Sequence, residues 1–224
     1  MNTWIVIAAY NEEHSIGFVV KELAKAGYRN VVVVDDGSDD ETSRIAKQHT
    51  KHVLRHVVNR GQGAALKTGI DYALANDADI VVTFDADGQH RVEDIPALLA
   101  PVKKDEVDIA LGSRFLKKDS GVPFFRKIVL KGGVFLLWIF YGVRLTDAHN
   151  GFRALSRHAA EQIEITLDGM EHASEIVSEI RRKQLRYVEV PVVIRYTEYS
   201  KAHGQSSWNA VKIFYKMIVH RFSK

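Results

Sequence analysis

The segment Val31-Val32-Val33-Val34-Asp35-Asp36-Gly37-Ser38 joins an unbroken apolar run to an acidic turn. Four consecutive valines are typical of a strand that is buried on both faces, as in a parallel sheet. A second apolar run, Ile80-Val81-Val82-Thr83-Phe84, also ends in acids, Asp85-Ala86-Asp87. We therefore predict two buried strands whose carboxyl ends carry carboxylates.

Helical patterns alternate with these strands. Apolar periodicity predicts helices over 15–26, 41–50 and 64–76, and further strands over 4–9, 52–58 and 109–113. This alternation predicts an α/β fold of the Rossmann-like kind, a mostly parallel mixed sheet with helices on both faces. Such sheets bind ligands beyond the carboxyl ends of their strands, where both acidic turns fall.

The whole chain is predicted to form one domain. It has 224 residues, of which 46% are hydrophobic, and the pattern is completed by a helix over 170–182 and a strand over 187–195. The absence of cysteine excludes disulfides and a cysteine nucleophile. No basic region precedes the first apolar run, so we expect no signal peptide and a cytoplasmic location.

Charge is distributed unevenly along the chain. Residues 1–112 contain 12 Lys and Arg against 18 Asp and Glu, whereas residues 113–224 contain 19 against 10. This asymmetry indicates that the second half faces something anionic, such as a phosphorylated substrate, a membrane surface or nucleic acid. Scattered, solvated lysines are the alternative.

Two segments of the second half could contact a membrane. The apolar stretch 128–143 falls short of the ~20 residues needed to span a bilayer. It is expected to be either a membrane-interface segment or an ordinary core helix. Residues 208–224 are predicted to form a basic amphipathic helix that binds anionic lipid, a partner helix or a second copy.

The acidic triplet has the pattern of a divalent-cation site. Side chains at positions i and i+2 of an extended segment point to the same side, so Asp85 and Asp87 converge. Their hard oxygen atoms suit Mg²⁺ or Mn²⁺ shared with a substrate diphosphate, and Gln89 could add a ligand. Such acids also serve as turn or capping residues, a role that Asp35 or Asp36 could equally play.

Several short motifs occur in the order seen in family 2 glycosyltransferases. The chain most resembles the branch of dolichyl-phosphate mannose synthases and polyprenyl-phosphate glycosyltransferases, and the resemblance covers nearly the whole chain. The motifs are Ala9-Tyr10-Asn11-Glu12, Val34-Asp35-Asp36-Gly37-Ser38, Asn59-Arg60-Gly61-Gln62-Gly63, Asp85-Ala86-Asp87-Gly88-Gln89-His90, Gly112-Ser113-Arg114 and Asn150-Gly151-Phe152-Arg153.

The resemblance implies an A-type glycosyltransferase fold and a set of roles. Catalysis would depend on Asp87 and Arg114, and Arg114 would meet the phosphates. The donor sugar nucleotide would be held by Ala9, Tyr10, Glu12, Asp36, Asp85 and Ala86, and Mg²⁺ or Mn²⁺ by Asp85, Asp87 and Gln89. Ala9 stands where the family usually has proline. Members of this branch often carry transmembrane helices after the catalytic domain, so anchoring here is expected to need a membrane-embedded partner protein.

The acceptor determines which other groups are needed. A phosphate monoester is already anionic near neutral pH and needs mainly positioning, for which Arg114, Arg126, Lys127 and Lys131 are candidates. The alternative for this basic cluster is a solvated helix face. A sugar hydroxyl acceptor in polysaccharide or glycan synthesis would instead need a base, for which Glu171 or Glu175 is the candidate.

These observations predict an inverting glycosyltransferase that moves a hexose from a UDP- or GDP-linked sugar to a polyprenyl phosphate. It would act peripherally at the cytoplasmic membrane face, without a nucleic-acid partner. The rivals are a sugar nucleotidyltransferase, whose glycine- and lysine-rich loop is absent from residues 8–15, and a non-enzymatic nucleotide-sugar binding module.

Two further patterns carry little functional weight. Gly61-Gln62-Gly63 matches a dinucleotide fingerprint poorly, because Leu66 replaces the third glycine. The histidines at positions 49, 52 and 56 have no acidic neighbour in the sequence, and we predict a surface role for them.

Overall fold

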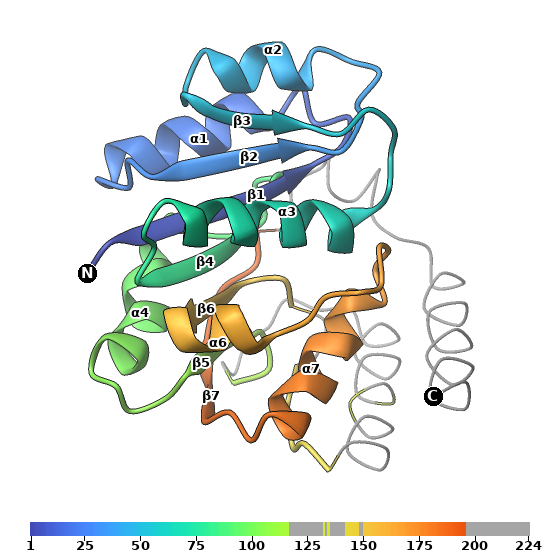
Figure 1. Cartoon of the computed structure of the whole chain (residues 1–224). Helices are drawn as coiled ribbons and strands as arrows, with labels where there is room; N and C mark the ends of the chain where they lie inside the picture. The colour runs from blue at the N-terminus through green and yellow to red at the C-terminus, as the bar shows by residue number, and fades with distance from the viewer. Residues whose placement is uncertain (117–131, 133, 135–141, 148–149, 196–224) are drawn as a thin grey trace.

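The computed structural model describes residues 1–116, 132, 134, 142–147 and 150–195. These residues form one mixed sheet with helices on both faces (Figure 1). The strands are β1 (Thr3–Ala9), β2 (Val31–Asp35), β3 (His52–Arg55), β4 (Ile80–Asp85), β5 (Ile109–Ser113), β6 (Arg153–Ser156) and β7 (Tyr187–Pro191). The helices are α1 (Ile16–Lys25), α2 (Thr42–Lys47), α3 (Gln62–Ala75), α4 (Ile95–Lys103), α6 (Arg157–Gln162) and α7 (His172–Arg182), with a short 3-10 turn over Val92–Asp94.

The sheet has the order β3-β2-β1-β4-β6-β5-β7. Among the strands of the described residues, only β6 runs antiparallel to its two neighbours, β4 and β5. The other pairs are parallel, so β1, β2 and β4 end at the same edge. Because β6 runs the other way, it begins at that edge, and the turn before it can reach the ends of its neighbours.

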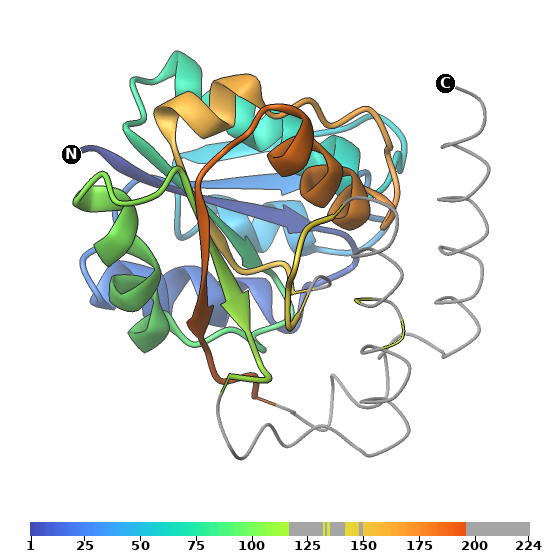
Figure 2. The same ribbon diagram turned by 90° about the horizontal axis from the view of Figure 1, so that it is seen from below.

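Alternation along the strands divides the core into two layers. Ile5 and Ile7 of β1 pack into the cluster that contains α1 and α4, whereas Trp4 and Val6 pack into the cluster that contains α3, α6 and α7. Figure 2 shows the sheet between these two groups of helices. Burial of both faces explains why these strands are apolar at nearly every position.

The predicted α/β fold is confirmed, with differences at particular elements. The structure also contains α4, β6 and α6, which the sequence pattern did not predict. The predicted strand over 187–195 is shorter in the structure, since β7 ends at Pro191, which has no amide hydrogen to donate to a neighbouring strand. The predicted helix over 41–50 is likewise reduced to α2.

Several predictions concern residues outside the described part of the chain. These are Arg126, Lys127, Lys131, most of the apolar stretch 128–143 and the predicted helix 208–224. Within the described residues, every helix is too short or too polar to cross a bilayer.

Candidate active site

A cleft of about 460 Å³ lies at the carboxyl ends of β1, β2 and β4. The strand register places Ala9 beside Asp35 and Ala8 beside Asp85, so the three strand ends open onto the same space. Its volume is that of a pocket for a small organic ligand. The cleft is lined by Ala8, Ala9, Tyr10, Glu12, Asp36, Asn59, Gly61, Gln62, Ala65, Asp85, Ala86, Asp87 and Met170.

The cleft brings together most of the donor and metal candidates that the sequence singled out. Asp85 and Asp87 line it from β4 and the following turn, while the methyl group of Ala86 is anchored in the apolar core. Gln89 and Arg114 are not among the described residues that line the cleft. The backbone N–H of Gln89 donates to Oδ1 of Asp87 over 2.9 Å, so Gln89 supports the acidic turn through its main chain.

The surroundings of the acidic turn disfavour the charged form of Asp87. Burial raises the pKa of Asp87 to about 7, and the nearby charges of Asp85 and Glu12 act in the same direction. Hydrogen bonding from the Gln89 backbone acts against this rise. Two carboxylates that repel each other in a partly buried site are stabilised when a cation lies between them.

This donor set fits a divalent metal that shares its ligands with a substrate. Among the described residues, no group of three His, Asp or Glu side chains could hold a metal ion on its own. Asp85 and Asp87 supply two hard oxygen ligands, and the remaining ligands would be water and phosphate oxygen atoms, as Mg²⁺ commonly has.

The segment before β6 packs directly behind Asp85. A side-chain carbon on Gly151 would lie only 2.6 Å from Oδ1 of Asp85, so a larger residue cannot be accommodated without displacing the carboxylate. The hydroxyl of Thr83 donates to the carbonyl oxygen of Gly151 and holds this segment in place. His90 contacts Asp85 from another side, with Nε2 and Oδ2 separated by 3.1 Å.

Asp36 occupies the end of β2, and its carboxylate is surrounded by donors from the protein. Oδ2 accepts the backbone N–H of Gly61 over 2.6 Å, and Oδ1 accepts that of Arg60 over 3.1 Å. The Nδ1 atom of His56 also lies 2.6 Å from Oδ1. Asp36 therefore fixes the loop that leads into α3.

The prediction that His56 has no acidic companion and lies at the surface is wrong. Its side chain is only 13% exposed and forms an ion-pair contact with Asp36. The two residues lie 20 positions apart in the sequence, but β3 pairs with β2 in parallel, so both follow the ends of adjacent strands. The sequence signal for this contact is the acidic turn at the end of β2. It becomes informative only when β3 is known to lie beside β2.

Asp35 has the turn role that the sequence left open between the two acids. Its Oδ1 atom accepts the backbone N–H of Ser38 over 2.9 Å, and its side chain is fully buried. The hydroxyl of Ser38 in turn accepts the backbone N–H of Asn11 over 2.9 Å. The turn after β2 is thereby tied to the loop after β1, which contributes Tyr10 and Glu12 to the cleft.

The glycines at the start of α3 allow this part of the chain to pack closely against the loop around Asp168. The backbone N–H groups of Gly63 and Ala64 donate to the carbonyl oxygen of Asp168 over 2.7 and 3.2 Å. A side-chain carbon on Gly61 or Gly63 would approach this same segment to within 2.4 or 2.1 Å. In a dinucleotide-binding motif, backbone amides at this position would donate to a phosphate group. Here the amides of Gly63 and Ala64 donate to the carbonyl oxygen of Asp168 instead, which agrees with the poor sequence match.

Arg114 forms a bidentate ion pair with Asp147. Its Nε and terminal nitrogen donate to the two carboxylate oxygen atoms of Asp147 over 2.6 and 2.7 Å.

Arg153 is only 2% exposed. Burial lowers its pKa to about 10, while Asp85 and Asp147 oppose this effect, so Arg153 remains a buried cation close to the acidic pair.

The two candidate bases for a hydroxyl acceptor do not line the described cleft. Glu175 accepts the backbone N–H groups of Thr166 and Leu167, both over 3.0 Å, and so caps that loop. Glu171 is buried at the start of α7, next to Gly169. His172 follows it, and burial lowers its pKa to about 4, so this histidine is neutral.

Known proteins with similar sequences extend over nearly the whole chain. An uncharacterized protein of Methanocaldococcus jannaschii is 40% identical, covering 97% of this chain and 91% of its own length. A UDP-N-acetylglucosamine–dolichyl-phosphate N-acetylglucosaminyltransferase of Methanococcus voltae is 33% identical, covering 99% and 96%. A dolichol-phosphate mannosyltransferase of Pyrococcus furiosus is 31% identical, covering 97% and 64%.

A solved structure shares the fold. The crystal structure of glucosyl-3-phosphoglycerate synthase from Mycobacterium tuberculosis, in complex with Mn²⁺, UDP and glucosyl-3-phosphoglycerate, has a TM-score of 0.73. It covers 99% of this chain and 79% of that protein, with 16% sequence identity, and this likeness shows the A-type glycosyltransferase fold.

Residues 4–164 match the family described as "Glycosyl transferase family 2". The chain therefore belongs to glycosyl transferase family 2.

Proposed function

We propose that this protein transfers a sugar from a nucleotide diphosphate sugar to a polyprenyl phosphate. The observation that carries the proposal is the cleft that Asp85 and Asp87 line together with Tyr10, Glu12 and Asp36, in which the pKa of Asp87 is raised to about 7. The names of the Methanococcus voltae and Pyrococcus furiosus relatives both specify a dolichyl- or dolichol-phosphate sugar transferase. These two names specify different sugars, and we leave the sugar to experiment.

The donor would lie across the ends of β1 and β2. Tyr10 lines the cleft and is 44% exposed, and its ring offers a face for the nucleotide base. Glu12 supplies acceptors for the ribose hydroxyls, and Ala9 and Ala86 leave room for the nucleotide. Asp36 supports this subsite through the loop that it holds, in addition to any direct contact.

The diphosphate end of the donor would lie over the acidic pair. Asp85 and Asp87 would hold Mg²⁺ or Mn²⁺, with Gln89 as a third candidate ligand. When bound, the metal stabilises the negative charge that develops on the departing diphosphate. The protein residues orient the anomeric carbon toward the acceptor, and Asp87, whose pKa burial raises to about 7, would bind the cation in its ionised form.

The acceptor phosphate would attack the anomeric carbon directly. A new bond forms between a phosphate oxygen and that carbon while the bond to the diphosphate breaks, which inverts the configuration. The attacking phosphate is already anionic, so the reaction needs no general base. This requirement agrees with Glu175, whose carboxylate is occupied by two backbone amides. Arg114, Arg126 and Lys131 are the proposed partners of the acceptor phosphate.

The lipid acceptor implies that the protein works at a membrane surface. We propose that it acts peripherally on the cytoplasmic face, with the segment 128–143 and the basic segment 208–224 at the headgroup level. A membrane-embedded partner protein would then handle the lipid product.

The function is tested by pairing donors and acceptors. UDP-N-acetylglucosamine, UDP-glucose and GDP-mannose are each incubated with Mn²⁺ and either a short polyprenyl phosphate, the matching polyprenol or a soluble sugar. We expect a polyprenyl-phosphate sugar, identified by mass spectrometry, with one donor and with the phosphate acceptor alone. Equal transfer to the polyprenol or the soluble sugar would contradict the phosphate acceptor and would make Glu171 the base to test.

A single variant tests the acceptor subsite. Arg126→Ala should raise the apparent KM for polyprenyl phosphate or lower kcat, because the acceptor phosphate loses a charged partner. Binding of the donor, measured without acceptor, should stay nearly unchanged. Weakened donor binding in this variant would place Arg126 in the donor subsite instead.

A further inference from the structure

We propose that His90 is a positioning residue that orients the Asp85 carboxylate toward the cation. This inference rests on the proposed function, since it assumes that Asp85 is a metal ligand. His90 lies five residues after Asp85 and does not line the cleft itself. It acts through Asp85 and has no contact with the substrate.

The hydrogen bonds of Asp85 define the tautomer of His90. The backbone N–H of Asp85 points at Nδ1 of His90, with the two nitrogen atoms 3.1 Å apart. A backbone N–H can only donate, so Nδ1 must be the unprotonated acceptor nitrogen. The hydrogen of the neutral ring then lies on Nε2, which is 3.1 Å from Oδ2 of Asp85. One ring thus accepts a hydrogen bond from the main chain of Asp85 and contacts the side chain of the same residue.

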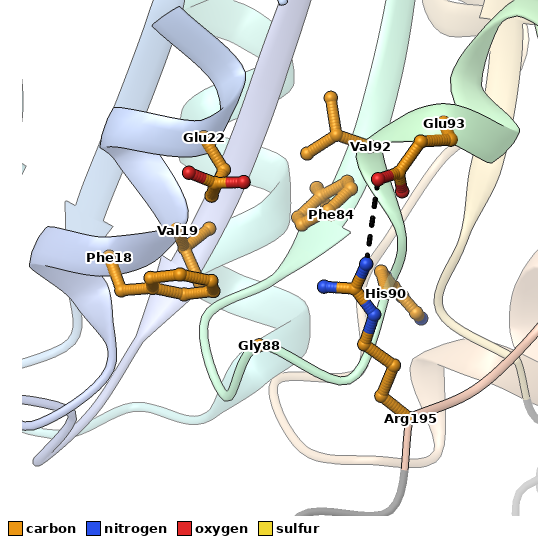
Figure 3. A pocket seen from close by; sticks show the side chains of 9 residues that line it. All are labelled: Phe18, Val19, Glu22, Phe84, Gly88, His90, Val92, Glu93 and Arg195. Carbon is orange, nitrogen blue, oxygen red and sulfur yellow. Dashed lines mark hydrogen bonds and ion pairs between the residues drawn. The ribbon is translucent and has the colours of Figure 1, made fainter. Parts of the chain in front are cut away.

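Aromatic packing prevents the His90 ring from turning away. The ring stacks on Phe152 with a centroid distance of 4.6 Å and an interplanar angle of 15°. Phe84 meets it edge-on at 5.2 Å, and His90 is only 4% exposed. Figure 3 views the ring from a second, small pocket, which His90 lines together with Phe84 and Arg195. The side-chain oxygen of Asn150 also accepts from the ring and therefore shares the Nε2–H, since Nδ1 is already an acceptor and the Asn150 side-chain nitrogen has no partner among the described residues.

A neutral donor suits a metal ligand better than a charged one. A lysine or arginine at this position would cancel the charge of Asp85 and compete with the cation. Nε2 of the neutral His90 ring contacts Oδ2 at 3.1 Å without cancelling that charge, and Gly151 packs against Oδ1 from another direction. The carboxylate is thereby oriented before a cation arrives, as outer partners of metal ligands generally achieve.

Two substitutions at His90 separate the contact with the carboxylate from the contact with the backbone. In His90→Asn the side-chain oxygen can replace Nδ1 as the acceptor for the Asp85 N–H, but the donor to Oδ2 is lost. In His90→Gln the amide nitrogen can replace Nε2 as that donor, but the acceptor is lost. His52→Asn is the matched control, because His52 also packs on two aromatic rings, Trp4 and Tyr72, with its Nδ1 on the Tyr72 hydroxyl.

The readouts are the dissociation constant for Mn²⁺ alone, from water proton relaxation, and the Tm. We expect His90→Asn to weaken Mn²⁺ binding about 10- to 100-fold, while His90→Gln stays within about threefold of the native protein. Both should have similar Tm values, and His52→Asn should keep the native affinity.

Three results would overturn the inference. One is native Mn²⁺ affinity in His90→Asn, and another is equal loss of affinity in both His90 variants, in proportion to lost stability. The third is that Mn²⁺ binds equally to the native protein and to Asp87→Ala, which would refute the metal role of the acidic turn in the proposed function as well.

Discussion

The acidic ends of β2 and β4 lie at the same edge of the sheet, on either side of β1, yet their carboxylates are in opposite situations. Asp36 is 2% exposed and is held by the backbone of Arg60 and Gly61 and by the ring of His56. Asp87 has a backbone partner in Gln89, but burial and the charge of Asp85 raise its pKa to about 7. One end satisfies its charge within the protein, and the other leaves charge for a ligand.

The difference separates two functions that look alike in the sequence. A carboxylate whose lone pairs accept protein N–H groups builds the structure around it, and its removal leaves buried donors without partners. A carboxylate pair with excess charge is costly for the free protein and is stabilised by a cation. We therefore expect substitutions at the two ends to have opposite effects on activity and stability.

The largest effect on activity is expected from Asp87→Ala. Loss of a charged metal ligand should abolish transfer, a fall in kcat/KM of at least about 1000-fold. The Tm should not fall, since the substitution removes a carboxylate that is destabilised by its surroundings. Transfer assays with saturating Mn²⁺ and thermal unfolding check both outcomes. A folded Asp87→Ala protein that retains activity would refute the metal assignment.

Removal of the metal should have nearly the same effect as Asp87→Ala. Exhaustive chelation is expected to stop turnover, and added Mn²⁺ or Mg²⁺ should restore it, since both ions suit carboxylate and diphosphate oxygen atoms. A control dialysis without chelator accounts for losses during handling. Full activity in the chelated protein would show that the acidic turn works without a cation.

Gly151→Ala is expected to have an intermediate effect. The added methyl group would lie 2.6 Å from Oδ1 of Asp85 and must displace the carboxylate. We predict a fall in kcat/KM of about 10- to 100-fold, because a metal ligand is misplaced while its charge is kept. Gly132→Ala serves as the control, since no atom of the described residues lies within 4 Å of its added carbon. Equal activity of the two variants would show that Asp85 tolerates displacement.

The smallest effect on chemistry is expected at the other strand end. Asp36→Ala removes the acceptor of two backbone N–H groups and should lower the free energy of unfolding by about 1–3 kcal/mol. Donor affinity should fall because the loop bearing Gly61 loosens, while Mn²⁺ binding persists. Chemical denaturation and donor titration measure the two effects. An unchanged unfolding free energy combined with loss of Mn²⁺ binding would reverse the comparison.

The sequence predicted the parts of the fold that depend on local pattern. The valines of β2 and the alternation around β1 and β4 indicated a covered parallel sheet, and the strand-end acids indicated the binding edge. The helix α4 was missed because Pro96 and Pro101 obscure its periodicity, although Pro96 occupies the first turn, where a missing N–H is tolerated. β6 was missed because it has only four residues, one of them the buried Arg153.

The contacts that distinguish the site residues join distant parts of the chain. Asp36 meets His56 across 20 residues, and Arg114 meets Asp147 across 33. Neither pair follows from periodicity, because each depends on which strands become neighbours. The sequence therefore predicted which acids lie at the site, but it did not distinguish the acid that supports the loop from the acids that are available for a cation.

The most direct test of this distinction is the effect of Mn²⁺ on the affinity for UDP and GDP, measured by isothermal titration calorimetry. It is compared in the native protein, Asp36→Asn and Asp87→Asn. We predict that Mn²⁺ tightens binding of the preferred nucleotide at least about tenfold in the native protein and in Asp36→Asn, but has no effect in Asp87→Asn. Equal enhancement by Mn²⁺ in Asp87→Asn, or its loss only in Asp36→Asn, would contradict the account.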